Sequence, residues 1–177
     1  MQKRYLEFIN NFGNKILSIN ENYSNLVFLC VGTNRIIGDA IGPIIGDNLK
    51  CIENNFMKVY GTTQNTLNFS NAQEIIKKIY NEYKSPFLIT IDAALGNKKE
   101  VGNIFIGNGF IKLGNALEKN ICFYSDITIK CVVGNYLLNK NQNIEELRNA
   151  DFGNVITMSK IVSNGIINVL KNFNIYV

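Results

Sequence analysis

Two aspartates that each follow a buried apolar run are the residues of this sequence best suited to chemistry. Asp39 lies in the segment VGTNRIIGDAIGP, in which the apolar run NLVFLCV ends, and Asp92 follows the run FLITI. In open parallel sheets, ligands bind beyond the carboxyl ends of the strands. Two strands that both run into acidic turns therefore place both carboxylates on one rim, where two nearby acids can share a proton and act as general acid and base.

The glycines around Asp39 are not spaced as in a phosphate-binding loop. Gly32 and Gly38 enclose five residues, the segment has no GxGxxG pattern, and an aspartate stands where a P-loop has its lysine. An anion at this helix N-terminus would meet a carboxylate, so the site suits a neutral group, a cation or a water molecule to be activated. This pattern argues against a flavodoxin-like nucleotide binder, which would share the topology.

Each of these residues also has a purely structural interpretation. Asp39 can cap the helix that contains Pro43 in its first turn, and Asp92 can end a strand through an Asx turn. Gly32 and Gly38 can simply supply positive φ angles. What favours a functional pair is that both acids follow the two most apolar strands of the chain.

Composition excludes several classes of site and partner. The chain contains no histidine, which rules out Ser-His-Asp and Cys-His hydrolases, HExxH metalloproteases and His-ligated metal sites. Acid–base chemistry at neutral pH must then come from carboxylates, Lys, Tyr or Cys with shifted pKa values. The net charge of +4 forms no basic stripe, so we expect no nucleic-acid partner. The cysteines form no CxxC pair, and we expect them to be reduced and buried: Cys30, Cys51, Cys122 and Cys131.

Length and hydropathy predict a single domain over residues 1–177. No apolar run approaches the roughly 20 residues needed to span a bilayer, and the N-terminus is too polar for a signal peptide. We therefore expect a cytoplasmic protein with no membrane partner. A domain of this size often forms a homodimer.

The elements that must position the two acids alternate between helical and strand patterns. Apolar residues at helical spacing predict a helix at the N-terminus and further helices over 43–54, 71–83 and 155–173. Apolar runs predict strands at 26–31, 57–60, 87–91, 101–106 and 122–133. Residues 139–151 form a loop or a short helix. This order predicts an α/β fold with a parallel sheet covered by helices on both faces. The glycine-rich segment 107–116 is either a wall or lid of the site or an ordinary hairpin connection.

Several motifs, in order and at matching spacing, resemble the YyaC family of sporulation proteins, which are regarded as spore proteases. They extend from about Leu26 to Ile167: GTN-x3-GDAIGP, KVYGT, PFLITIDAALG, VGNIFIGNG-x-IKLGNALEK and SDITI. That family is related to the spore germination protease and to hydrogenase maturation proteases. The resemblance implies a three-layer α/β/α sandwich of the phosphorylase/hydrolase-like type, with a mostly parallel sheet.

The resemblance also implies roles for particular positions. Asp39 and Asp92 match the two acidic residues of these peptidases, the pair thought to carry catalysis in the germination protease. Asn34 matches the asparagine of the wider G-x-G-N turn. Asp126 matches the aspartate of the family stretch GDIHITG, in which Thr128 replaces the histidine.

The function implied is a spore peptidase that hydrolyses peptide bonds with a pair of aspartates during sporulation or germination, inside the sporulating cell or the spore. The substrate is then a peptide or protein. The amide of Asn34 and the backbone N–H groups around Gly32 and Gly38 can stabilise the oxyanion. Because Thr128 and a residue near Asn68 stand in place of the family histidines, we expect no metal and no cofactor. The alternative is a catalytically degenerate peptidase-fold protein that binds a peptide or a partner protein.

Overall fold

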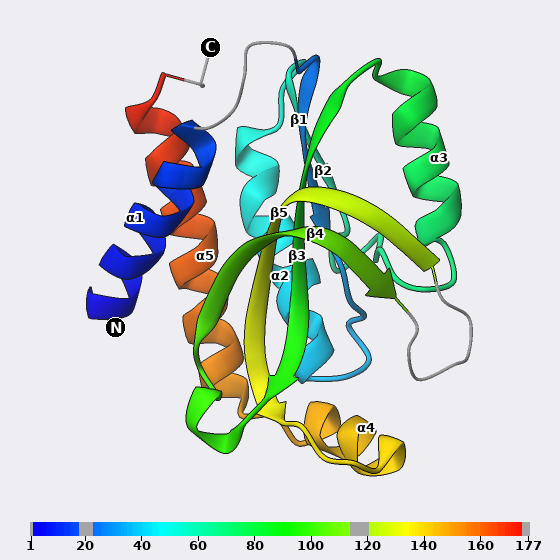
Figure 1. Cartoon of the computed structure of the whole chain (residues 1–177), viewed down its shortest axis with the longest axis vertical. Coiled ribbons are helices and arrows are strands. Elements are labelled where there is room, and N and C mark those ends of the chain that lie inside the picture. The colour runs from blue at the N-terminus through cyan, green and yellow to red at the C-terminus, as the bar shows by residue number, and fades with distance from the viewer. Residues whose placement is uncertain (1, 18–22, 114–120, 175–177) are drawn as a thin grey trace.

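The computed structural model describes residues 2–17, 23–113 and 121–174 of the chain, and its strands form one twisted sheet. Within these ranges the sheet has five strands in the order β2-β1-β3-β5-β4 (Figure 1). The parallel strands are β1 (Asn25–Cys30), β2 (Met57–Tyr60), β3 (Pro86–Gly96) and β5 (Ile121–Asn135). At one edge, β4 (Ile104–Leu113) runs antiparallel to β5. The mostly parallel sheet predicted from the sequence is confirmed.

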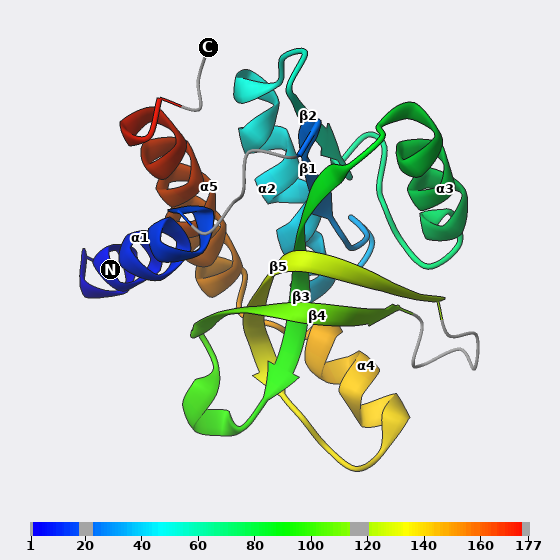
Figure 2. The ribbon, with the colours of Figure 1, turned by 45° about the horizontal axis from the view of Figure 1, so that its top comes forward.

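Helices cover both faces of this sheet and make it the middle of three layers (Figure 2). On one face lie α1 (Gln2–Leu17), α2 (Ile41–Leu49) and α5 (Phe152–Asn172), and on the other lies α3 (Ala72–Glu82). The short helix α4 (Lys140–Arg148) lies at the end of the sheet toward which β3 and β5 point (Figure 1). No helix within the described ranges has the length and apolar character to cross a membrane.

The central strand β1 shows why the apolar runs are continuous. Phe28 and Cys30 belong to the larger core, which α1, α2 and α5 share with the sheet. Val27 and Leu29 belong to the smaller core beneath α3. Because side chains alternate between the two faces of a strand and both faces are covered, every residue of β1 must be buried.

Glycines let α2 lie unusually close to the strands behind it. A Cβ atom at Gly42 would overlap the backbone carbonyl of Val31, and one at Gly46 would overlap the carbonyl of Gly61. These contacts hold α2 against the residues that follow β1 and β2, and the short 3-10 helix η1 (Gly38–Ala40) before it packs against α2 and β3. The same glycines thus fix the position of Asp39, which η1 carries.

Several sequence-based boundaries are wrong in ways that matter for the site. Strand β3 does not end before Asp92 but continues to Gly96 beside β5. Strand β4 begins at Ile104 and contains residues 107–113, so this part of the glycine-rich segment is neither a lid nor a hairpin connection; residues 114–116 lie outside the described residues. Each strand is longer than its apolar run because pairing with β5 continues through glycine and polar residues.

The cysteines divide into two classes. Cys30 and Cys131 are buried in the larger core, as expected. Cys51 and Cys122 are exposed, so the expectation of burial is wrong for them. All four are free thiols.

Candidate active site

Asp39 is held by a loop that leaves β1 and turns back on itself. The backbone N–H of Thr33 donates to the Asp39 carbonyl oxygen at 3.2 Å. Gly32, with φ of 145°, makes the turn and lies against the same carbonyl, so its predicted need for positive φ is confirmed. The N-cap of α2 is Ala40, which makes no side-chain cap bond. The interpretation of Asp39 as a helix cap is therefore wrong.

Gly38 has a different reason to be glycine from the one expected. It is not among the described glycines with positive φ. Instead, a Cβ atom at this position would lie 2.9 Å from the Leu147 carbonyl oxygen of α4 and 2.9 Å from a methyl group of Val133 in β5. Gly38 thus allows η1 to lie in close contact with α4 and β5.

Asp92 lies just beyond the point where β1 stops pairing with β3. The last pair in register is Cys30 with Ile91, and the N–H of Val31 then donates to the Ile91 carbonyl at 2.8 Å. Past this point β3 continues with Asp92 beside Lys130 of β5. Because η1 packs against β3, the two elements that carry the acids are neighbours. Asp92 lies inside a strand, so the Asx-turn interpretation of this residue is wrong.

The two carboxyl groups influence one another. Burial and then the charge of Asp39 raise the pKa of Asp92 to about 7, against the opposing effects of the N–H of Ala93 and the charge of Lys130. Burial also raises the pKa of Asp39, whereas a hydrogen bond from the N–H of Thr33 opposes this rise. Both acids keep part of their surface exposed. At neutral pH this pair can therefore hold one proton, and Asp92 is the carboxyl that keeps it.

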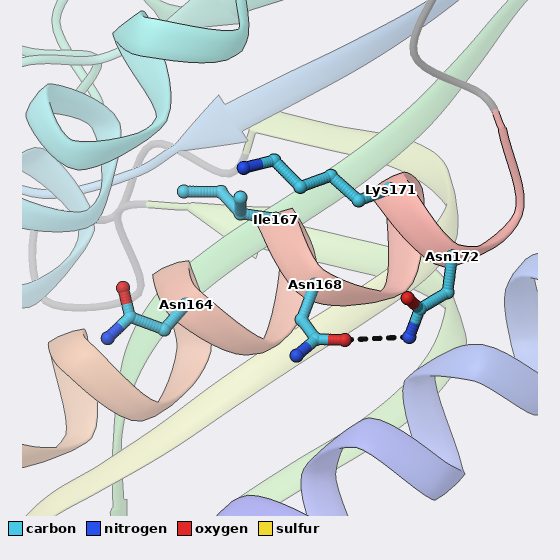
Figure 3. Close-up of a pocket in the computed structure, with 5 residues that line it drawn as sticks. All are labelled: Asn164, Ile167, Asn168, Lys171 and Asn172. Atoms are coloured by element: carbon cyan, nitrogen blue, oxygen red, sulfur yellow. Dashed lines mark hydrogen bonds between the residues drawn. The ribbon is translucent and has the colours of Figure 1, made fainter.

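Three surface hollows within the described residues lie away from this pair. One, of about 270 Å³, lies over α5 and is lined by Asn164, Ile167, Asn168, Lys171 and Asn172 (Figure 3). It contains amides and one ammonium group but no carboxylate that could serve as a general base. We take the aspartate pair as the candidate site because, in the described part of the chain, two partly exposed carboxyl groups on neighbouring elements both have raised pKa values.

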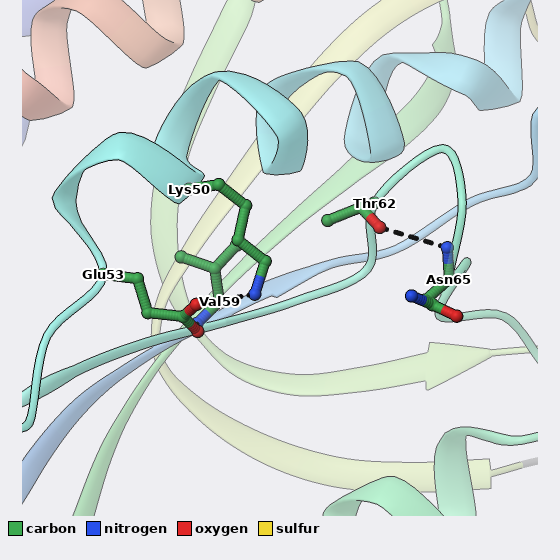
Figure 4. A network of polar contacts seen from close by, with 5 residues as sticks. All are labelled: Lys50, Glu53, Val59, Thr62 and Asn65. Atoms are coloured by element: carbon green, nitrogen blue, oxygen red, sulfur yellow. Dashed lines mark hydrogen bonds and ion pairs between the residues drawn. The ribbon is translucent and has the colours of Figure 1, made fainter.

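The loop after β2 is tied to the loop that carries Asp39. The side-chain amide of Asn34 donates to the Thr63 carbonyl at 2.9 Å. The backbone N–H and hydroxyl of Thr63 donate in turn to the carboxylate of Asp47 in α2, at 3.1 and 2.6 Å. Within the loop, the N–H of Asn65 donates to the hydroxyl of Thr62 at 3.1 Å (Figure 4). One N–H of Asn34 is therefore used structurally; the oxyanion role stays a prediction for the other.

The structure does not bring Asp126 to the acid pair. Its carboxylate accepts the backbone N–H of Leu88 at 2.8 Å, and the hydroxyl of Ser125 donates to the Leu88 carbonyl at 3.1 Å. Leu88 lies four residues before Asp92, which is about 13 Å along an extended strand. Asp126 thus joins β5 to β3 at the far end of their pairing.

Thr128 lies nearer to the pair, and it has a neighbour that the sequence analysis missed. Thr128 is paired in register with Thr90 of β3, which is 1% exposed and whose hydroxyl has no hydrogen-bond partner. Thr90 lies two residues before Asp92 and hence on the same face of β3. The signal was visible in the sequence as a single hydroxyl within the apolar run FLITI, at a spacing of two from the aspartate.

The described side chains around the pair offer few ligands for a metal ion. In the described part of the chain, no three His, Cys, Asp or Glu side chains are grouped so that they could hold a metal ion. Asp39 and Asp92 offer two carboxylates and Thr128 a hydroxyl, and no imidazole is available because the sequence has no histidine.

Comparisons with known proteins agree with the resemblance and with the fold. A family model described as "Protein of unknown function (DUF1256)" matches residues 2–165. Over 141 residues the chain is 32% identical to the Bacillus subtilis (strain 168) protein described as "Uncharacterized protein YyaC", which covers 80% of this chain and 67% of YyaC. The structure of this chain is similar to that of the NiFe hydrogenase maturation protease HycI from Thermococcus kodakarensis KOD1. The TM-score is 0.58 at 15% identity, over 91% of this chain and 99% of HycI, so the fold is protease-like. The chain belongs to the DUF1256 family and is a relative of YyaC, which confirms the resemblance inferred from its motifs.

Proposed function

We propose that this protein is a peptidase that hydrolyses peptide bonds with Asp39 and Asp92. The observation that carries the proposal is the coupling of two partly exposed carboxyl groups from different elements, in which the charge of Asp39 helps to raise the pKa of Asp92 to about 7. Neither acid is explained by the capping or turn roles that aspartates usually fill. The protease-like fold supports the same reading.

The two acids have distinct roles in the proposed reaction. Asp39, whose ionised form the Thr33 N–H stabilises, takes a proton from water as the water oxygen attacks the carbonyl carbon. Asp92, which holds the shared proton, hydrogen-bonds the carbonyl oxygen. When the tetrahedral intermediate collapses, the C–N bond breaks and the leaving amine receives a proton from the pair. General acid–base help of this kind contributes roughly 10²–10⁴-fold, and orientation and oxyanion stabilisation supply the rest.

The direct test replaces each acid by its amide. We expect Asp39→Asn and Asp92→Asn each to lower the cleavage rate of a proteome-derived peptide library by at least about 100-fold, measured by mass spectrometry. The matched control is Glu7→Gln, a carboxylate-to-amide change on the exposed face of α1. Thermal unfolding must show that all three variants fold. If cleavage survives both aspartate changes, the dyad mechanism is refuted.

A second candidate function is peptide binding without cleavage. The observation that favours it is the absence of histidine from the whole chain, with Thr128 at the position of a family histidine. In that case the library would be retained by the immobilised protein while no fragment appeared. Retention lost in Asp39→Asn or Asp92→Asn, with no cleavage by the unaltered protein, would favour the binding function over the peptidase.

We extend the peptidase proposal to a role in sporulation or germination, within the sporulating cell or the spore. It is supported by the motifs shared with sporulation proteins and by the identity to YyaC. The test is a proteomic comparison of dormant and germinating spores with and without the protein. We expect one protein to persist uncleaved in its absence; identical fragment profiles would refute this role.

A further inference from the structure

The hydroxyl of Thr90 is the one buried side-chain oxygen or nitrogen in the described residues that has no hydrogen-bond partner. Other buried hydroxyl groups are satisfied: Ser125 donates to the Leu88 carbonyl, Ser159 to the Ile156 carbonyl, and Ser163 to the Ser159 carbonyl. A buried hydroxyl without a partner in the chain destabilises the fold, and a bound water molecule would satisfy it.

The position of Thr90 limits what this group can be. Thr90 and Asp92 lie on one face of β3, and two residues span about 6.6 Å along a strand. That separation is too long for a direct hydrogen bond. This is a separation of backbone positions, and side chains on one face of a strand can lean toward one another, so that a single water molecule with two hydrogen bonds of about 2.8 Å can join the hydroxyl and the carboxyl group.

The surroundings supply the further polar contact that a buried water needs. Thr128 faces Thr90 across the β3–β5 pairing, and parallel strands lie about 4.8 Å apart. Gly107 of β4 pairs with Thr128, and a Cβ atom there would approach the Thr128 hydroxyl to 3.3 Å. Gly107 thus leaves open the side of Thr128 that faces β4, whereas Thr90 lies on its other side, in β3. Buried waters typically have two to four polar partners, and this position offers three side chains.

We propose that Thr90, Asp92 and Thr128 bind one buried water molecule, and that Thr90 positions Asp92 through this water. When Asp92 is ionised, the water donates to its carboxylate; when it is protonated, its O–H donates to the water. Hydrogen bonds to a charged acceptor are the stronger of the two, so the water favours the ionised form. The other groups that act on Asp92 are the carboxyl of Asp39 on η1, the ammonium of Lys130 on β5 and the N–H of Ala93.

The role in catalysis rests on the proposed peptidase function, whereas the water site itself does not. Thr90→Val removes the hydroxyl and keeps nearly the same shape. We expect the pKa of Asp92 to rise by about one pH unit in this variant, because the ionised form loses a hydrogen bond. The measurement is a ¹³C NMR titration of protein labelled at the aspartate carboxyl carbons, with Asp92→Asn used to assign the signal. Thr90→Ser restores the hydroxyl and should return the pKa to its original value.

The control is Thr62→Val, at a buried threonine whose hydroxyl already has a partner in Asn65. It should lower the melting temperature and leave the titration of Asp92 unchanged. An unchanged or lowered pKa of Asp92 in Thr90→Val overturns the water site, and so does a failure of Thr90→Ser to restore it. If Thr90→Val does not fold, Thr90→Ala carries the same expectation.

The two proposals fail in different ways. If the protein cleaves no peptide but Thr90→Val still moves the pKa of Asp92, the peptidase proposal fails and the water site stands. If it cleaves peptides and Thr90→Val leaves Asp92 unchanged, the water site fails alone. If both proposals hold, the alkaline limb of the kcat/KM profile should shift to higher pH in Thr90→Val, along with the pKa of Asp92. It should return to its original position in Thr90→Ser.

Discussion

Acidic and hydroxyl side chains lie in different environments at the two ends of β3. At the amino end, Asp126 and Ser125 form hydrogen bonds to the backbone of Leu88, and these polar groups act as connectors within the sheet. Toward the carboxyl end, burial and the charge of Asp39 disfavour the ionised form of Asp92, and the hydroxyl of Thr90 has no hydrogen-bond partner. The first arrangement stabilises the fold, whereas the second costs stability. A costly arrangement of polar groups is a reason to look for function there.

The largest expected effect that separates the two ends is on the pH profile of hydrolysis. Asp92 must be protonated to act as the acid, so kcat/KM should fall about tenfold per pH unit above pH 7. On the acidic side it should fall as Asp39 gains a proton. The measurement is kcat/KM on the best-cleaved peptide between pH 4 and pH 9. A profile that is flat from pH 6 to pH 9 would remove Asp92 as the general acid.

Stability should respond in opposite directions at the two ends. Asp126→Ala leaves the buried N–H of Leu88 without an acceptor and should lower the free energy of unfolding by about 1–3 kcal/mol. Asp92→Asn removes a carboxyl whose pKa is higher in the folded than in the unfolded protein. It should raise the free energy of unfolding at pH 8 by about 2 kcal/mol, a value reduced for partial solvent screening.

The sign of the Asp92 effect depends on pH. Between the ordinary aspartate pKa of about 3.9 and the folded-state value, the folded protein binds more protons, so the native protein loses stability as pH rises through this range. The gain from Asp92→Asn should therefore be large at pH 8 and small near pH 4, as measured by urea unfolding. Asp126→Asn, which keeps an acceptor oxygen, should lose less than Asp126→Ala. A destabilised Asp92→Asn at pH 8 would show that Asp92 is structural, like Asp126.

The smallest effect is expected at Glu53, a connector at the far side of the sheet. Although burial opposes it, the pKa of Glu53 is lowered by Lys50, whose ammonium lies 2.7 Å away, and by the N–H of Val59 (Figure 4). Its stabilisation is therefore present above the ordinary Glu pKa and lost as pH falls through the folded-state value. Glu53→Gln should cost about 0.5–1 kcal/mol at pH 7 and almost nothing near pH 3, by urea unfolding. An equal cost at both pH values would exclude the charge as its origin.

Much of the fold could be predicted from local sequence, and the errors in the predicted strand bounds share one cause. The run MKVY was predicted to be a strand and is β2 over the same residues. The end of β3 was missed because Asp92 reads locally as a breaker, yet β5 supplies pairing partners as far as Gly96. The end of β4 was missed for the same reason, since Gly107 and Gly109 are held in the strand by β5. Tertiary pairing overrides the local signal where a long neighbouring strand is available.

The site residues likewise divide into those that local sequence indicated and those whose roles depend on tertiary contacts. Asp39 and Asp92 were found because each follows an apolar run, a signal that lies within a few residues of sequence. Asp126 was assigned by motif alone, and its hydrogen bond to Leu88 joins residues 38 positions apart, which no local pattern reveals. Thr90 is visible in the sequence as a hydroxyl two residues before Asp92, but nothing in the sequence marks it as important. Whether its hydroxyl has a hydrogen-bond partner depends on the residues packed around it.

The amino-acid sequence by itself determined the alternation of helices and strands and the apolar runs that precede the two acids. It also determined the absence of imidazole chemistry. These features depend on residue type and short-range periodicity. Only the tertiary structure decided that Asp39 influences Asp92, that Asp92 keeps the proton and that Thr90 lies unpartnered beside it. Charge coupling and desolvation depend on distance and burial, and both arise only when segments distant in the chain pack together.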